Sequence, residues 1–202
     1  MERARVVVLV SGSGTNLQAL VDAAADPSYP AEVVAVGSDL LEIPALGRAE
    51  AADIETFTVV PDQHPSRAAW DLVLADTVAV HLPDFVVMAG FMRLVGPVFL
   101  ERFPHRVINT HPALLPAFAG LDAPQQAVDY GAKVTGCTIF VVDEGVDTGP
   151  IVAQAAVPVV AGDDRDSLHD RIKQHERQLL VDTVANLATH PYRIDGRKVV
   201  WT

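Results

Sequence analysis

Short apolar runs alternate with stretches of helical spacing along the first hundred residues of the chain. The run at 5–10 is rich in β-branched residues and ends in a glycine-rich turn, which is typical of a buried parallel strand. Directly after it, Leu17, Leu20 and Val21 share one helical face, and Asp26-Pro27 ends that helix. Further strands are predicted at 32–37, 56–60, 85–89 and 106–109, and helices at 43–52 and 67–80, the second with Ser66 as its N-cap.

This alternation predicts an α/β fold with a doubly wound, mostly parallel sheet and right-handed crossovers. The second half of the chain differs, because two long β segments at 133–142 and 151–160 are separated by a loop of Gly, Asp and Pro at 143–150. We expect these segments to form an antiparallel strand pair. A long covering helix is predicted at 165–188 and a small hairpin at 192–201. Because no repeat or composition break interrupts the chain, residues 1–202 are expected to form a single domain.

The composition indicates a globular protein that needs no disulfides. Of the 202 residues, 50% are hydrophobic and 20% are charged, which excludes an intrinsically disordered chain. Cys137 is the single cysteine, and residues 1–5 lead into the first strand without the pattern of a signal peptide. The longest apolar run, 85–92, is far shorter than the roughly 18 residues that span a bilayer. We therefore expect a cytoplasmic protein with no membrane partner.

The charge balance argues against a nucleic-acid partner. Fifteen Lys and Arg residues stand against 26 Asp and Glu residues, which gives a net charge of −11 at pH 7. Binding to a polymer of phosphates relies on a basic face, which this chain does not offer. An anionic small ligand must then be held locally, by backbone N–H groups and a few chosen cations.

The turn at 11–16 has the features of a phosphate-binding loop. Its sequence, SGSGTN, joins a strand to a helix whose first N–H groups are unpaired and favour an anion. Leu17 stands where a dinucleotide-binding fingerprint has its third glycine, and the lysine of the triphosphate-binding loop is absent as well. A phosphomonoester therefore fits better than either ligand. A glycine-rich turn with no ligand is the alternative that the pattern leaves open.

A second candidate site follows the predicted strand at 106–109. Asn109 and His111 lie at the carboxyl edge of the sheet, where open α/β folds bind ligands, and alternation places them on one side of the strand. An amide that donates to a developing oxyanion, beside an imidazole that moves protons near neutral pH, suits acyl transfer. Asp147, in the loop at 143–150, would orient the ring if the two meet. Purely structural roles for His111 and Asp147 are the alternative.

The segment at 90–95, GFMRLV, leaves the strand at 85–89 at the same predicted edge. It combines an apolar wall with backbone polar groups, as a flat heteroaromatic ligand requires. Ordinary core packing is the other interpretation of this composition. The remaining histidines show no spacing to Cys, Asp or Glu that is typical of a metal site.

Four ordered segments resemble the folate-dependent glycinamide ribonucleotide formyltransferase family: SGSGTNLQAL at 11–20, VVMAGFMRLVGP at 86–97, VINTHPALLP at 107–116 and GVDTGPIVAQ at 145–154. Together they extend over nearly the whole chain. The resemblance implies a parallel-sheet α/β catalytic domain without a metal. It also implies that 10-formyltetrahydrofolate is the co-substrate and that the formyl group passes to the amine of glycinamide ribonucleotide in purine biosynthesis. Residues 1–105 are then the nucleotide-binding half, and 106–202 the folate-binding and catalytic half.

The resemblance also implies roles for single residues. Three groups match the family's motifs: the catalytic residues, the substrate-binding residues and the folate-binding residues. The catalytic residues are Asn109, His111 and Asp147. Substrate-binding residues are Gly14, Thr15, Asn16, Lys173 and Glu176. Folate-binding residues are Arg67, Met92, Arg93, Leu94, Val95, Asn109, Asp143, Glu144, Gly145, Val146 and Asp147.

The chain departs from the family's usual pattern at two positions. Asp122 stands where the family usually has a histidine, and Phe140 stands where a second histidine is common. The stretch at 120–126 is also similar to the corresponding part of the methionyl-tRNA and sugar-nucleotide formyltransferases. Related formyltetrahydrofolate hydrolases and the tRNA enzymes carry an additional domain, so a chain of 202 residues is expected to be neither.

Two other functions stay open from the sequence. One is a formyltransferase for a different small amine, such as an amino-sugar nucleotide, and the other is a catalytically silent folate- or nucleotide-binding module. A nicotinamide oxidoreductase is disfavoured by the incomplete glycine fingerprint. The expected partners are small-molecule substrates, and a homodimer is one of the oligomeric states that the sequence allows.

Overall fold

The computed structural model describes residues 2–202. These residues form two compact units, one ending at Asn109 and the other beginning at Thr110. Met1, the first residue of the predicted domain, lies outside the described residues. The division falls close to the predicted boundary between residues 105 and 106. That the first half binds the nucleotide and the second binds folate and catalyses stays a prediction.

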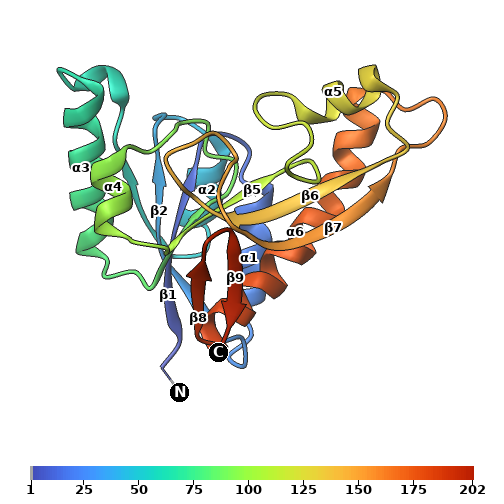
Figure 1. Cartoon of the computed structure of the whole chain (residues 1–202). Helices are drawn as coiled ribbons and strands as arrows, with labels where there is room; N and C mark the ends of the chain where they lie inside the picture. Colours follow the sequence, from blue (N-terminus) through green and yellow to red (C-terminus); the bar gives the residue numbers. More distant parts are fainter. Residues whose placement is uncertain (1) are drawn as a thin grey trace. The chain divides into compact units, whose positions relative to one another are not determined.

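The first unit is built on parallel strands in the order β3-β2-β1-β4-β5 (Figure 1). The chain reverses its direction of growth between β3 and β4, so β1 and β4 are neighbours at the point where open α/β sheets bind ligands. The elements are β1 (Ala4–Val10), α1 (Thr15–Ala24), β2 (Ala31–Ser38), α2 (Pro44–Glu50), β3 (Glu55–Thr58), the short 3₁₀ helix η1 (Pro61–Gln63), α3 (Arg67–Val80), β4 (Phe85–Met88), α4 (Pro97–Arg102) and β5 (Val107–His111), of which the last two residues belong to the second unit.

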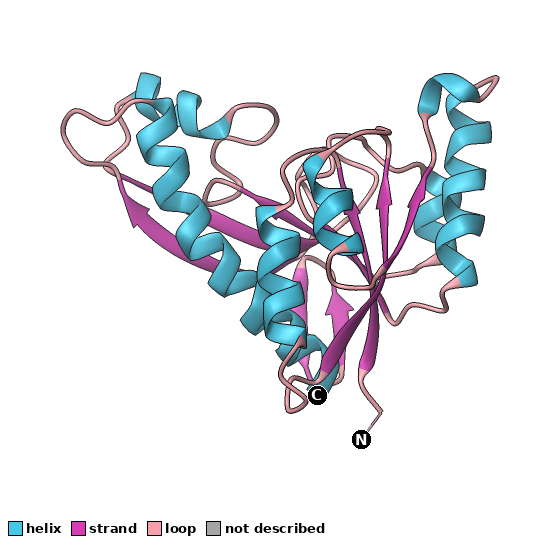
Figure 2. Cartoon of the chain, turned by 180° about the vertical axis from the view of Figure 1, so that it is seen from behind, coloured by secondary structure: helices cyan, strands magenta, loops and turns pink. Residues whose placement is uncertain are grey.

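Helices cover this sheet because their apolar faces need burial. Helices α1 and α2 lie together on the face turned toward the viewer in Figure 2, and α3 packs against α4. Trp70 of α3 is fully buried, and its indole N–H donates to the Val59 carbonyl at 2.8 Å, which satisfies the one polar atom that the ring brings into the core. The predicted N-cap is confirmed, since the Ser66 hydroxyl accepts from the Ala69 N–H at 3.2 Å.

The second unit is built on an antiparallel pair. Its elements are α5 (Ala123–Tyr130), β6 (Val134–Val141), β7 (Ile151–Pro158), α6 (Arg165–Thr189), β8 (Tyr192–Asp195) and β9 (Lys198–Trp201). Strands β6 and β7 pair antiparallel from Val134 opposite Pro158 to Phe140 opposite Ile151, and β8 and β9 form the predicted hairpin. Both views show α6 running along β6 and β7 (Figures 1 and 2). The strand pair and the covering helix are therefore confirmed.

The core of the second unit lies between α5, α6 and the strand pair. It consists of fully buried apolar side chains from each of these elements: Ala127, Cys137, Val157, Leu168 and Ile172. Helices α4 and α5 were not among the predicted elements. Both are short, and each starts with a proline in its first turn, so neither shows the repeated apolar spacing that marks a longer helix.

Candidate active site

The turn between β1 and α1 is held from one side by α2. The Ala45 N–H donates to the Gly12 carbonyl at 3.2 Å, and Arg48 Nε donates to the Ser13 carbonyl at 2.8 Å. In a trans peptide the N–H of the next residue points opposite to the carbonyl, so the N–H groups of Ser13 and Gly14 point away from α2. Helix α2 thus orients the N–H groups of the turn in the way that an anion cradle requires.

Gly14 is required at the start of α1. It is the N-cap with φ of 71°, and a Cβ at this position would lie 2.6 Å from Ala45 Cβ. Only glycine combines the left-handed conformation with such close approach of another helix. Thr15 and the buried Asn16 then form the first turn of α1, at the positive end of the helix. The three predicted phosphate-binding residues therefore lie in one continuous helix start.

The segment after β4 is tied to the same turn. The Met92 N–H donates to the Ser11 hydroxyl at 2.8 Å, and the Ser11 N–H donates to the Gly90 carbonyl at 3.2 Å. Met92 and Leu94 are exposed, whereas Val95 is buried, so the segment has a free apolar side and an anchored end. An exposed apolar wall supported by backbone contacts suits a flat ring.

Two cations that were expected near folate have partners of their own. Arg93 forms a salt bridge through Nε to the carboxylate of Asp39 at 2.8 Å, with Asp39 only 2% exposed. Arg67, at the start of α3, lies over the ring of Trp70, with its guanidinium carbon 5.2 Å from the ring centroid. Arg93 is therefore a fixed charge, and Asp39 is a buried residue of this region that the sequence reasoning missed.

The second unit brings His111 and Asp147 together. His111 Nδ1 lies 3.2 Å from Asp147 Oδ2, and the two side chains are 6% and 12% exposed. His111 ends β5 and Asp147 belongs to the loop between β6 and β7, so the pairing depends on the fold rather than on sequence proximity. Asn109 lies two residues before His111 on the same strand and so points to the same side of it. A carboxylate that fixes an imidazole supports proton transfer at the ring's other nitrogen.

A tight loop wraps the His111–Asp147 pair. His111 Nε2 lies 2.8 Å from the Phe118 carbonyl, and the Gly120 N–H donates to Asp147 Oδ2 at 2.8 Å. Phe118, Gly120 and Asp122 all have positive φ, which gives the loop its sharp path. A neutral imidazole carries one N–H, so the ring donates to both the carboxylate and the Phe118 carbonyl only when it is doubly protonated.

Two polar residues of β6 and β7 support the segment that follows His111. The Thr138 hydroxyl donates to the Ala113 carbonyl at 2.7 Å and accepts from the Leu115 N–H at 3.0 Å. The Gln154 amide donates to the Leu115 carbonyl and to the Thr138 hydroxyl, both at 2.9 Å. Sequence reasoning missed both residues. Thr138 and Gln154 are opposite each other in the β6–β7 register, which the pattern of either segment alone does not contain.

The loop at 143–150 is held by its own side chains. Asp143 Oδ1 accepts from the Thr148 hydroxyl at 2.7 Å and from the Gly145 N–H at 3.1 Å. A Cβ at Gly149 would lie 1.7 Å from the Val141 carbonyl oxygen, so a larger residue there would displace the strand end. Of the predicted folate residues in this loop, Val146 is exposed and Asp147 is turned onto His111. Glu144 is exposed as well.

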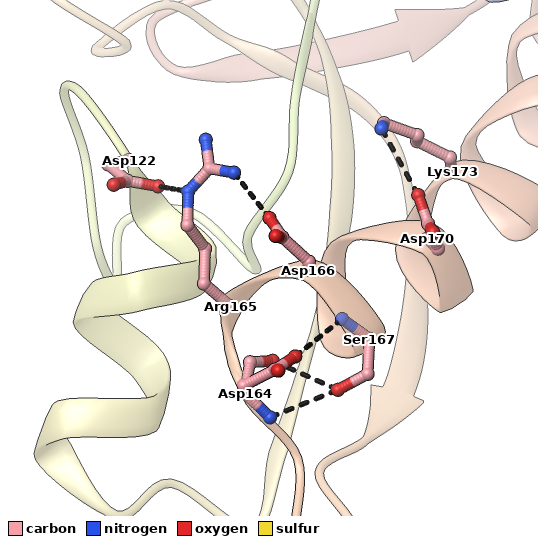
Figure 3. A network of polar contacts seen from close by, with 7 residues as sticks. All are labelled: Asp122, Asp164, Arg165, Asp166, Ser167, Asp170 and Lys173. Carbon is pink, nitrogen blue, oxygen red and sulfur yellow. Dashed lines mark hydrogen bonds and ion pairs between the residues drawn. The ribbon is translucent and has the colours of Figure 1, made fainter.

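Helix α6 carries the other predicted substrate residues. Figure 3 shows the polar contacts at the start of this helix, where Lys173 Nζ lies 3.3 Å from Asp170 and Arg165 Nε lies 2.8 Å from Asp122. The side chain of Lys173 is 34% exposed, whereas Glu176 is only 5% exposed. Lys173 is thus the more accessible of the two. Burial, and after it the charge of Glu176, raises the pKa of the Cys137 thiol.

The two positions where the family's histidines are absent have structural roles in this chain. Asp122 is the N-cap residue of α5 and forms the salt bridge to Arg165, and Phe140 is 2% exposed in β6. Within residues 2–202, no group of three or more His, Cys, Asp or Glu side chains is arranged to hold a metal ion. None of the helices described for these residues is both long enough and apolar enough to cross a membrane.

Comparisons with known proteins point to one family. The model of the formyl transferase family matches residues 4–184. The phosphoribosylglycinamide formyltransferase of Mycobacterium tuberculosis H37Rv is 55% identical over 194 residues, which cover 96% of this chain and 89% of that protein. The trifunctional purine biosynthetic protein adenosine-3 of Bos taurus is 37% identical over 201 residues, covering 99% of this chain and 20% of its own length. The crystal structure of glycinamide ribonucleotide transformylase 1 from Symbiobacterium toebii is similar with a TM-score of 0.95 and 43% identity, covering 98% and 93% of the two chains.

Proposed function

The chain belongs to the formyl transferase family, and we propose that it transfers the formyl group of 10-formyltetrahydrofolate to the amine of glycinamide ribonucleotide. The products are formylglycinamide ribonucleotide and tetrahydrofolate, as a step of purine biosynthesis. The observation that carries the proposal is the nearly buried pair of His111 and Asp147, 3.2 Å apart, in a chain that is 55% identical to a relative named for this reaction.

The substrate phosphate is proposed to bind at the start of α1. Gly14, Thr15 and Asn16 supply N–H groups at the positive end of the helix, and α2 fixes the turn from the opposite side. In the second unit, Lys173 and Glu176 are proposed to contact the ribonucleotide. Lys173 would exchange its ion pair with Asp170 for the ligand, because an exposed pair of this kind contributes little stability.

Folate is proposed to contact two segments. In the first unit, the exposed side chains of Met92 and Leu94 offer an apolar wall, and Arg67 and Arg93 offer positive charge to its carboxylates. Val95 anchors this segment in the core. In the second unit the loop from Asp143 to Asp147, with Glu144, Gly145 and Val146, supplies polar backbone groups that the bond from Thr148 to Asp143 keeps in place.

The proposed chemistry is direct transfer. The amine nitrogen attacks the formyl carbon, so that a C–N bond forms and the carbonyl oxygen becomes an oxyanion in a tetrahedral intermediate. Asn109 and His111 stabilise that oxygen by donating hydrogen bonds. The amine then loses a proton, N10 of the folate gains one through His111 or a water ordered by Asp147, and the bond from carbon to N10 breaks. Holding both reactants in line supplies a further part of the rate.

His111 must change its partner for this chemistry. Nε2 faces the Phe118 carbonyl at 2.8 Å, so the substrate's oxygen or nitrogen replaces that carbonyl as the ring's partner during turnover. Nδ1 keeps Asp147, which holds the ring orientation through the exchange. The ring therefore offers one nitrogen to the reaction and one to the protein.

A panel of amine acceptors tests the proposal. The purified protein is incubated with 10-formyltetrahydrofolate and, in separate reactions, glycinamide ribonucleotide, a uridine-diphosphate amino sugar, or no acceptor. Rapid formation of tetrahydrofolate in the reaction with glycinamide ribonucleotide, and in neither of the other two reactions, supports the proposal. Transfer only to the amino sugar would assign the alternative substrate. Failure to complete even one turnover with any of the acceptors would indicate a silent binding module.

A further inference from the structure

Four residues at the carboxyl ends of β1, β2 and β4 form a closed ring of polar contacts. Asp39 accepts a hydrogen bond from the Ser11 hydroxyl at 2.6 Å through Oδ1, and pairs with Arg93 Nε at 2.8 Å through Oδ2. Ser11 in turn accepts the Met92 N–H at 2.8 Å, and Met92 is joined to Arg93 through the chain. The ring thus connects the residue that opens the phosphate turn to two residues of the segment at 92–95.

We propose that Asp39 is a positioning residue that sets the phosphate turn and the folate-contacting segment in one fixed arrangement. The inference rests on the proposed function, because that function assigns the phosphate to Gly14–Asn16 and the folate to residues 92–95. It goes beyond that function by identifying a group that touches neither ligand in this assignment and on which the geometry of both sites depends.

Burial is what gives Asp39 this role. Its side chain is 2% exposed, so water cannot replace a lost donor, and a charged carboxylate in such a place needs both of its partners. The pair with Arg93 is charge-assisted and therefore shorter and stronger than a neutral hydrogen bond. Movement of either Ser11 or Arg93 away from the carboxylate would leave a buried charge without one of its partners. The ring therefore resists movement of both residues.

The position of Asp39 in the fold places the ring beside the phosphate turn and beside residues 92–95, the folate-contacting segment of the first unit. Asp39 directly follows β2, Ser11 directly follows β1, and Met92 follows β4, and these three strands are neighbours in the order β2-β1-β4. Ser11 also receives support from its own N–H bond to Gly90. Ser11 is the first residue of the phosphate turn, and its hydroxyl accepts a hydrogen bond from the backbone of Met92, whose side chain is exposed.

The same ring holds Arg93 for its expected ligand. The contact with Asp39 uses Nε, and 45% of the Arg93 side chain remains exposed. The carboxylate therefore fixes the direction of the guanidinium while leaving part of it accessible to an anionic group. Loss of the Asp39 charge would free Arg93 to reorient, and it would loosen Ser11 at the same time. Both substrates should then bind more weakly.

The test compares steady-state constants for both substrates in a small set of variants. Asp39→Asn keeps an oxygen for the Ser11 hydroxyl and removes the charge that pairs with Arg93. We expect KM for glycinamide ribonucleotide and KM for 10-formyltetrahydrofolate each to rise about tenfold, with kcat changed by less than about threefold. A rise in only one of the two KM values, or in neither, overturns the proposal.

A double variant tests whether the pair itself is responsible. The glutamine side chain places its amide atoms as many bonds from the backbone as arginine places Nε, so Arg93→Gln retains a donor to Asp39 and loses the charge. In Asp39→Asn/Arg93→Gln a neutral amide pair can replace the salt bridge. We expect its KM for glycinamide ribonucleotide, a substrate not assigned to Arg93, to return to within about threefold of wild type. If this KM in the double variant instead rises by the product of the factors seen in the two single variants, the proposal is overturned. If Asp39→Asn does not fold, Arg93→Gln alone must still raise that KM.

Asp71→Asn provides the matched control. Asp71 is also 2% exposed in the first unit and accepts from the Gly96 and Phe99 N–H groups at the start of α4, the second at 3.0 Å. Its replacement should lower Tm while leaving KM for glycinamide ribonucleotide, the substrate that is not assigned to residues 92–95, within about twofold of wild type. Equal KM changes in Asp39→Asn and Asp71→Asn would show general loosening and overturn the positioning role. Failure of the proposed function is distinguishable, because the wild-type protein would then transfer no formyl group to glycinamide ribonucleotide.

Discussion

Individual residues in this protein show how burial assigns different tasks to similar groups. Asp147 and Asp39 are both nearly buried carboxylates with two partners each, but Asp147 faces an imidazole and Asp39 faces an arginine. An imidazole gains and loses protons near neutral pH, whereas a guanidinium stays charged. Asp147 is therefore suited to a proton-transfer site, and Asp39 to holding a fixed geometry.

Cys137 should be chemically inert in the folded protein. It is fully buried in β6, and burial, followed by the charge of Glu176, raises the pKa of its thiol to about 12. We expect negligible alkylation by iodoacetamide at pH 8 and rapid alkylation in denaturant, measured by mass spectrometry on the chain's one cysteine. Because the unfolded thiol ionises first, this group should also lower stability as pH rises above about 9. Fast labelling in native buffer would contradict the described environment.

Sequence reasoning missed several supporting residues for one physical reason, which is that their partners are distant in the chain. His111 and Asp147 lie in segments that resemble the family's motifs, and this resemblance implied that they act together, whereas their spacing alone left structural roles open. Asp39 has no local motif, because its partners lie 28 and 54 residues away. Gln154 likewise acts on Leu115, 39 residues earlier in the chain. Support of this kind depends on strand order and register, which the periodicity of a single segment does not contain.

At the scale of elements, local signals identified α1, α2, α3 and α6 and missed α4 and α5. Helix α3 begins at the residue that its N-cap predicts, because the Ser66 side chain and the first helical N–H group lie in one turn. Helix α4 is instead capped by Asp71, which accepts from the Gly96 and Phe99 N–H groups although it lies in α3. A cap supplied from another helix stabilises a six-residue segment that has little helical signal of its own.

The start of α1 gives a paired prediction about glycine. Gly14→Ala should destabilise the protein and raise KM for glycinamide ribonucleotide, because the position has positive φ and a Cβ would meet Ala45. Gly47→Ala, in α2, is the control: a Cβ there has nothing within 4 Å, and alanine should stabilise the helix by about 0.5–1 kcal/mol. Thermal unfolding and KM measurements on both variants check this. An equally tolerated change at Gly14 would contradict the role of the turn.

The start of α6 gives a prediction about pH. Arg171 contacts both oxygens of Asp163 at 2.7 Å and, together with the Val160 N–H, holds the pKa of Asp163 well below its ordinary value. A lowered pKa in the folded state contributes stability above the unfolded pKa of about 3.9, and this contribution is lost as pH falls through the folded pKa. Asp163→Asn should therefore lower Tm at pH 5–8, and the difference from wild type should shrink below about pH 4.

Serial measurement of Tm from pH 7 to pH 3 provides that test. Asp195→Asn is a suitable comparison, because Asp195 pairs with Arg193 at 3.2 Å on two side chains that are both more than half exposed. Such a pair should contribute little at any pH. A constant difference between wild type and Asp163→Asn throughout the acid range would show that packing, and not the charge of Asp163, stabilises this turn.

At the scale of the whole molecule, the net charge of −11 opposes both proposed substrates, which are anionic. Two of the cations expected to offset this charge are in ion pairs, Arg93 with Asp39 and Lys173 with Asp170. Attraction must then come from short-range contacts with fixed N–H groups and oriented guanidinium groups. The sequence indicated this need, but only the structure shows which cations are already paired.

This electrostatic balance predicts the response to salt. Because screening weakens the long-range repulsion, kcat/KM for glycinamide ribonucleotide should rise by up to about twofold between 10 and 200 mM potassium acetate. Repeating the series with potassium chloride separates screening from competition by a particular anion. A tenfold fall over the same range, on the order seen when steering is attractive, would contradict the prediction.

The proposed reaction depends most directly on His111. The decisive measurement is the single-turnover rate of formyl transfer from 10-formyltetrahydrofolate to glycinamide ribonucleotide, for the wild-type protein and for His111→Ala with an unchanged circular dichroism spectrum. We expect a rate reduced by about 10²–10⁴-fold in the variant, because proton transfer and oxyanion stabilisation are both lost. A rate within about threefold of wild type, at saturating concentrations of both substrates, would contradict the assignment of this site.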